Sequence, residues 1–449
     1  MIRIQKWIRD NCFYLFLFLA VLILEFRFYY RTSDDKQLYA DFLNAWGSMT
    51  FRNACSQVAA KVSADILKWS SRVIINFFAN FFVLYFPLWA VCNALVTVLF
   101  HARICGIFHA GGTRGKTLVL GLMLLMPIEI YRSCGWIVGT VSYYWPVVFL
   151  VTAFSILLEK TWRYSGKTMA VMLICLLYAC NEEIICVAVF LCLWIWLALH
   201  PEDKKIVLIL QAVCLAEFLW ILFCPGNRIR YSREPDRWFP RFDTLSVLHR
   251  MEMGFTSTMN RFWLRTCPVS AALGFVLLAL AFVRKRSGFM KLLAGVPLAA
   301  ALAGWAIREN VGRSQICHAI YSSEGQYGSL GLFHYTEPFR YLPMIFYICI
   351  GGIILVLLMD LENYSRVSIA VSLTLLAVTA SRCIMGFTPT IWVSARRTYS
   401  LMYWVLILII GYGYQQISRS DPERKIAPLC LAGTGLCSAF AVMDLMALL

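Results

Sequence analysis

Charged side chains are scarce in this sequence. They make up 15% of its 449 residues, whereas hydrophobic residues make up 60%. Soluble domains carry about 25% charged residues, and the mean hydropathy here is +0.68. A soluble globular protein is therefore excluded. The sequence also lacks the strict alternation of apolar and polar residues that a membrane β-barrel requires.

Paired metal-ligand patterns are missing as well. The 17 cysteines are scattered, many of them inside apolar runs, and no CxxC pair or Cys/His ligand spacing occurs. The cysteine pattern therefore indicates neither a zinc site nor a disulfide framework. Acidic residues number 25 against 41 basic ones, but most basic residues lie in short connections between apolar runs, where they set topology. No basic-aromatic tract suggests nucleic-acid binding.

The apolar residues come in blocks of about 15–25, the length of a helix that crosses a bilayer. We predict an all-α, polytopic transmembrane bundle of about thirteen spans, forming one integral membrane domain over residues 1–449. Arg3, Lys6 and Arg9 precede the first block, which predicts a cytoplasmic N-terminus and a retained first helix. The predicted spans are 12–30, 73–100, 117–130, 145–158, 168–179, 184–199, 206–223, 267–283, 292–307, 343–359, 367–380, 399–412 and 426–445.

This topology places the long connections on the outer face of the cytoplasmic membrane. They are residues 31–72, predicted to contain amphipathic helices, and the loops 224–265 and 308–342. The inner connections are short and basic. One of them, around Gly111 to Thr117, resembles a phosphate-binding loop but has Ala110 where the pattern needs glycine, so ATP binding is not expected.

Acidic residues gather at two predicted outer span ends. Asp34 and Asp35 follow the first span, and Asn181, Glu182 and Glu183 occupy almost the whole connection between two others. A carboxylate inside a span costs about 2.5–3.5 kcal/mol. We expect these acids to act in proton transfer or ligand binding, although Asn181 to Glu183 also fits a plain polar turn.

Paired arginines are expected on the same face. Arg228 and Arg230 follow a predicted Pro-Gly turn, and Arg396 and Arg397 precede a later span. Arginine binds phosphate bidentately, so an anionic ligand is one explanation and lipid headgroups are the other. A short outer connection carries four aromatic residues, which suit either an interfacial belt or a platform for a sugar or isoprenoid: Trp136, Tyr143, Tyr144 and Trp145.

An aspartate pair just after the first transmembrane helix resembles the acidic motif of GT-C glycosyltransferases, which use polyprenyl-phosphate sugars. The order of the later motifs resembles bacterial multi-pass proteins akin to GtrII-type O-antigen glucosyltransferases. Those motifs are Trp69-Ser70-Ser71-Arg72, Gly135-Trp136, Tyr144-Trp145-Pro146, Asn181-Glu182-Glu183 and Pro225-Gly226-Asn227.

The resemblance implies that Asp34 or Asp35 is the catalytic base. It implies that arginines hold the lipid phosphate, and that Asn181, Glu182 and Glu183 orient the acceptor or bind a divalent cation. The phosphate-binding set would be Arg72, Arg228, Arg230, Arg396 and Arg397. A polyprenyl-phosphate sugar would be the donor and a cell-envelope glycan the acceptor, with a donor synthase and a flippase as partners.

Two alternatives stay open. A transporter or flippase of an anionic lipid-linked glycan would explain the arginines without catalysis, and it predicts internal repeats and a polar path. A surface-polysaccharide polymerase or ligase would use arginine and histidine, for which His318 and His334 are the candidates.

Overall fold

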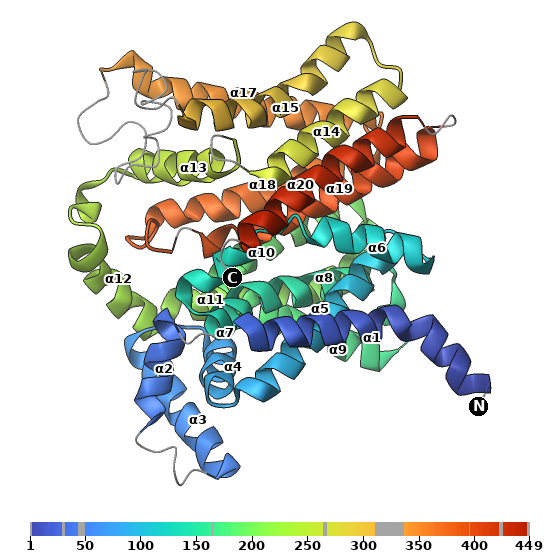
Figure 1. Ribbon diagram of the computed structural model, residues 1–449. Coiled ribbons are helices and arrows are strands. Elements are labelled where there is room, and N and C mark those ends of the chain that lie inside the picture. The colour runs from blue at the N-terminus through green and yellow to red at the C-terminus, as the bar shows by residue number, and fades with distance from the viewer. Residues whose placement is uncertain are drawn as a thin grey trace.

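The computed structural model describes residues 2–28, 32–43, 50–163, 165–263, 267–309, 336–394, 396–421 and 425–446. These residues form nineteen α-helices joined by short 3₁₀ turns, and no strand occurs among them. Most of the longer helices run along one common direction, so the bundle has two ends (Figure 1). The all-α prediction is confirmed.

Seven helical segments of the described chain are long and apolar enough to cross a membrane, which makes this a multi-pass membrane protein. The bent pair α13 (Val247–Trp263) and α14 (Pro268–Val283) makes an eighth if it counts as one span. The seven are Phe86–Ile107, Trp136–Leu158, Pro201–Phe223, Pro338–Leu361, Arg366–Phe387, Arg397–Ser420 and Ile426–Met443. The prediction of about thirteen spans stays a prediction.

Three polar helices lie together at one end of the bundle, which we call the site end. They are α2 (Ser33–Leu43), α3 (Phe51–Lys68) and α12 (Pro225–Trp238), at the left of Figure 1. The helix α1 (Ile2–Phe28) packs along α5 (Phe86–Ile107) and runs from the opposite end toward them. The N-terminus and α6 (Gly112–Met123) lie at that opposite end.

The opposite end holds the short basic connections. Asp203 forms ion pairs with Lys160 at 3.2 Å and with Arg163 at 2.5 Å. Glu362 pairs with Arg284 at 2.9 Å. The acidic residues at this end therefore neutralise basic loops.

Helices form at the predicted apolar runs, most of them within a few residues of the predicted bounds. They include α8 (Trp145–Leu158), α9 (Gly166–Cys180), α10 (Glu183–Leu199), α11 (Lys204–Phe223), α15 (Gly288–Glu309), α17 (Leu342–Leu361), α18 (Arg366–Cys383), α19 (Ser400–Ser420) and α20 (Ile426–Met446). Among the exceptions are α19, which continues to Ser420 instead of ending at 412, and the predicted span 117–130, which is α-helical only to Met123, the end of α6. The amphipathic segment 31–72 contains two helices, α2 and α3, as expected.

The prediction of one continuous span over residues 73–100 is wrong. The structure has two helices there, α4 (Val73–Leu84) and α5, separated at Tyr85, whose backbone leaves the helical conformation (φ −115°, ψ 62°). Pro87 lies in the first turn of α5. Proline lacks the N–H that a continuing helix needs but suits a first turn, so the apolar run breaks here.

The segment 224–265 was predicted as a loop and is largely helical. It contains α12, a 3₁₀ turn at Phe242–Thr244, and α13. Pro225 starts α12 instead of forming a Pro-Gly turn, since proline is favoured at a first helical position. Gly226 allows close packing, because a Cβ there would lie 2.6 Å from the backbone nitrogen of Trp69. Most of 308–342, with His318 and His334, lies outside the described residues.

Candidate functional site

Asp35 is a completely buried carboxylate that caps a helix from a distant part of the sequence. Its Oδ2 accepts the backbone N–H of Ile137 at 3.0 Å, and its Oδ1 accepts that of Val138 at 2.9 Å. These amides belong to α7 (Trp136–Gly139), the first turn of the Trp136–Leu158 span. A carboxylate at a helix N-terminus satisfies amides that have no partner within the helix. Asp35 therefore joins α2 to this span.

Gly135 is shaped to receive Asp35. Its φ of +98° is strained for any residue with a side chain, and a Cβ there would lie 2.5 Å from Cγ of Asp35. Glycine is thus required both for the backbone turn and for the close approach of the carboxylate.

The two aspartates have different environments. Burial raises the pKa of Asp35 to about 6, against the lowering effect of the amides of Val138, Ile137 and Trp136. Asp34 is exposed at the surface of α2, yet partial burial of its carboxyl raises its pKa, which nearby Arg397 lowers in turn. Asp35 is committed to the helix cap, whereas Asp34 keeps a solvent-facing carboxylate next to a cation.

Arg72, the residue before α4, draws together the acidic residues of the α9–α10 turn. Its Nε donates to Oε2 of Glu183 at 2.7 Å, and one terminal nitrogen contacts the same oxygen and, at 3.3 Å, Oε1 of Glu182. Glu182 also caps α10, because its Oε2 accepts the N–H of Ile185 at 2.9 Å. Oε1 of Glu183 is buried without a hydrogen-bond partner among the described residues. Burial raises the pKa of Glu182, while Arg72 lowers it.

Tyr143 connects this acidic cluster to the aspartates. Its hydroxyl accepts hydrogen bonds from Nη1 of Arg72 and from Nε of Arg397, each at 3.2 Å. Both guanidinium groups also lie near its ring, 5.4 Å and 5.7 Å from the centroid. A polar network therefore runs from Glu183 through Arg72, Tyr143 and Arg397 to the neighbourhood of Asp34.

Two asparagines hold the backbone around Arg72. Oδ1 of Asn181 accepts the N–H groups of Ile74 and Ile75, both at 3.1 Å, and so caps the start of α4. Oδ1 of Asn227 accepts the N–H of Ser71 at 3.2 Å, and its Nδ2 donates to the Ser71 hydroxyl at 2.9 Å. Motifs that are far apart in the sequence thus contact one another directly.

The remaining predicted arginines contribute less. Arg230 lies over the ring of Trp69, 5.7 Å from its centroid. Burial raises the pKa of nearby Glu234, and the charge of Arg230 offsets part of this rise. Arg228 and Arg396 are exposed. Arg72 is engaged by two carboxylates, so Arg397 is the predicted arginine that the structure places beside Asp34.

The aromatic segment around Trp136 to Trp145 was predicted as an outer connection, and that prediction is wrong. It forms the first turns of the Trp136–Leu158 span, and all four rings are buried. Trp136 donates to Oε2 of Glu25 at 2.5 Å, and Trp145 donates to Oδ1 of Asn93 at 2.7 Å. Their polar atoms are satisfied inside the bundle, so these rings pack the interior, and only Tyr143 joins the polar network described above.

One charged residue at the site end was missed as a ligand candidate. Arg382 is 1% exposed, and its three side-chain nitrogens have no hydrogen-bond acceptor in the described part of the chain. Its guanidinium lies 4.2 Å from the ring centroid of Tyr399. The sequence alone could have indicated Arg382, because it is a lone arginine at the end of an apolar run and ionisable residues within spans are costly and usually functional.

The arrangement offers an exposed carboxylate, fixed cations and a carboxylate oxygen without a hydrogen-bond partner among the described residues, all at one end of a helical bundle. Among the described residues, no three acidic side chains come together as a metal-ligand set. Comparison with known protein families, curated proteins and solved structures finds no match to this chain.

Proposed function

We propose that this protein is a membrane glycosyltransferase that transfers a sugar from a polyprenyl-phosphate donor to a cell-envelope glycan on the extracytoplasmic face. The observation that carries the proposal is the position of Asp34, whose exposed carboxyl lies beside Arg397 at the end of a polar network. A base next to a fixed cation is what such a transfer requires.

Asp34 is the catalytic base in this proposal. Both oxygens of Asp35 are occupied by backbone amides, so Asp35 positions α2 and leaves proton transfer to its neighbour. Asp34 takes the proton of an acceptor hydroxyl while that oxygen forms a bond to C1 of the sugar. The bond from C1 to the phosphate oxygen breaks, and polyprenyl phosphate leaves with the electron pair.

Cations at the site end stabilise the leaving phosphate. Arg397 is the main candidate because Tyr143 fixes its Nε, and Arg228, Arg230 and Arg396 lie on neighbouring segments of the same end. Arg382 adds a buried positive charge without a carboxylate partner among the described residues. Arg72 orients Glu183, and in this proposal the acceptor glycan donates a hydrogen bond to the buried Oε1 of Glu183, which has no partner among the described residues.

The proposed topology is GT-C-like, with about thirteen crossings and a cytoplasmic N-terminus. Four shorter apolar helices support crossings beyond the seven long ones: Val73–Leu84, Gly166–Cys180, Glu183–Leu199 and Gly288–Gly304. Separation of the basic connections from the site end supports the orientation. Donor synthesis and flipping would fall to partner proteins.

The proposal can be tested in the native cell. We expect deletion of the gene to remove one sugar from a surface glycan, measured by mass spectrometry, and the wild-type chain but not Asp34→Asn to restore it. Asp41→Asn, on the same helix but paired with Lys61, is the matched control and should restore it fully. A surface glycan that Asp34→Asn restores completely would overturn the assignment of the base.

The same experiment separates the alternatives. If the protein is instead a flippase, its deletion would leave the transferring enzyme intact, and the lipid-linked precursor would accumulate on the cytoplasmic leaflet. A polymerase or ligase would change chain length or attachment while leaving the repeating unit intact. Loss of a single sugar from an otherwise complete glycan is the result specific to the proposed transferase.

A further inference from the structure

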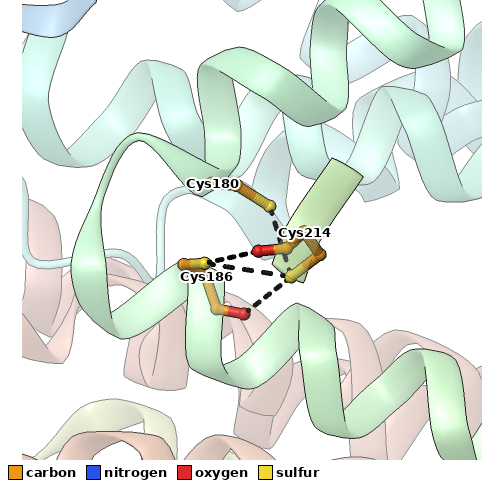
Figure 2. A group of neighbouring side chains, drawn as sticks. All are labelled: Cys180, Cys186 and Cys214. Atoms are coloured by element: carbon orange, nitrogen blue, oxygen red, sulfur yellow. Dashed lines mark hydrogen bonds between the residues drawn. The ribbon is translucent and has the colours of Figure 1, made fainter. Parts of the chain in front are cut away.

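We propose that Cys180, Cys186 and Cys214 form a three-sulfur site for a soft monovalent metal ion, with Cu(I) as the natural occupant. The three residues come from three different helices: Cys180 ends α9, Cys186 lies in the first turns of α10, and Cys214 lies in α11. Their side chains point toward one another, as Figure 2 shows.

The two sulfur separations measured from Cys214 match those of a metal-thiolate centre. The Sγ atom of Cys214 lies 3.9 Å from that of Cys180 and 3.8 Å from that of Cys186, and all three lie within 4.8 Å of one another. Three sulfurs bound at about 2.3 Å from a central ion are about 3.8–4.0 Å apart, depending on whether the ion lies in their plane. An ion therefore fits with little movement of the helices.

This convergence distinguishes the three thiols from the other buried cysteines. Cys175, for example, is also buried in α9 but belongs to no such group, and the described chain contains one set of three or more potential metal ligands, this one. All three thiols are essentially inaccessible to solvent. A cysteine can be buried simply because it behaves as a small hydrophobic residue, which would explain each of these thiols separately. It does not explain why three cysteines from three helices lie next to one another.

Protein groups satisfy the thiols only weakly. Cys214 donates to the backbone oxygen of Cys186 at 3.3 Å, and Cys186 donates to that of Cys214 at 3.6 Å. A thiol is a poor donor, so replacing these contacts with metal–sulfur bonds loses little. Each thiol that binds as a thiolate releases one proton.

The donor set identifies the class of ion. Sulfur ligands select soft metals such as Cu(I), whereas structural zinc is almost always four-coordinate. The ligand group has three members among the described residues, which favours a three-coordinate monovalent ion. Glu217, one turn beyond Cys214, has a buried oxygen without a hydrogen-bond partner in the described chain.

The site would clamp the helices that carry the acidic turn. Asn181 and Glu182 follow Cys180 directly, and Glu182 caps the helix that contains Cys186. A metal bound to all three sulfurs would fix α9, α10 and α11 relative to one another on both sides of this turn. The inference does not depend on sugar transfer.

The test uses full-length protein purified in detergent with its thiols reduced. We expect one equivalent of Cu(I), or of Ag(I) as a redox-inert probe, to bind in competition with a chromogenic chelator and to produce a sulfur-to-metal absorption band. X-ray absorption should show three sulfur neighbours. Bound metal should also raise the melting temperature by several degrees, since it binds the folded state selectively.

The variants are Cys214→Ser, which removes one ligand conservatively, and Cys175→Ala, which removes a buried thiol outside the group. We expect Cys214→Ser to weaken binding at least tenfold while remaining folded without metal, and Cys175→Ala to bind like the wild type. Equal binding by wild type and Cys214→Ser would overturn the site. Stoichiometric binding of Zn(II) with none of Cu(I) would overturn the assignment to a three-coordinate monovalent ion.

Discussion

Gly135→Ala should disrupt the contact between Asp35 and the start of α7. The added Cβ would lie 2.5 Å from Cγ and 2.6 Å from Oδ1 of Asp35, and 2.9 Å from its backbone nitrogen. Nonbonded carbon atoms prefer separations of about 3.5–4.0 Å. The carboxylate therefore has to move away from the start of α7.

The structure allows an estimate of the cost. A side chain at a φ of +98° is strained, and left-handed backbone costs about 1–2 kcal/mol for L-residues. Displacing Asp35 also leaves the N–H groups of Ile137 and Val138 without their acceptors, and an unsatisfied buried donor costs about 1–3 kcal/mol. Because local relaxation recovers part of this, we expect a loss of about 3–5 kcal/mol in the free energy of unfolding.

The assay is thermal unfolding of the purified protein in detergent, with Gly121→Ala as the matched control. Gly121 lies in α6, where an added Cβ meets nothing within 4 Å, so alanine should leave the midpoint unchanged or slightly raised. Gly135→Ala should lower the midpoint clearly and abolish sugar transfer because Asp34 moves with Asp35. Equal midpoints for Gly135→Ala and the wild type would refute the described contact between Asp35 and α7.

Three further outcomes are expected. The pKa of Asp35 is raised to about 6 from 3.8, so the stability it contributes is fully present below pH 3.8 and is lost as pH rises through 6; the difference corresponds to about 3 kcal/mol. Unfolding midpoints measured against pH should lose this step in Asp35→Asn. Arg72→Gln leaves Glu182 and Glu183 without their cation and should destabilise the fold by about 3 kcal/mol in denaturant titrations, whereas Glu183→Gln, which keeps the cation, should cost less. Arg382→Met removes a buried charge that has no hydrogen-bond acceptor among the described residues. It should raise the unfolding midpoint, because an isolated buried charge is costly, while lowering the transfer rate; a lower midpoint would contradict this.

The helices were predictable because lipid demands them. Apolar runs such as the one that forms α10 can satisfy their backbone groups only as helices, and their lengths set the predicted bounds. The exceptions have local causes. Pro87 breaks a run that hydropathy alone treats as continuous, and the polarity of α12 concealed a helix that packs against α3 through Gly226.

The site was predictable as a set of residues but not as a set of contacts. Topology alone placed the acidic and arginine motifs at one face, and the structure joins several of them. The sequence could not show that Asp35 caps α7 while Asp34 stays exposed, because adjacent residues on a helix point in different directions. Nor could spacing reveal Cys214 beside Cys180, since the ligands come from three helices and no short motif contains them.

The most direct test of the central claim is sugar transfer by the purified protein, supplied with a radiolabelled polyprenyl-phosphate hexose and a cell-envelope glycan acceptor. We expect labelled glycan from the wild type and at least a 100-fold lower rate from Asp34→Asn, the range typical for loss of a general base. The rate should also fall as pH drops through the pKa of Asp34, which burial raises above its usual value. Equal rates for the two proteins would contradict Asp34 as the base, and no product from a wild type that binds the lipid donor tightly would contradict the transferase itself.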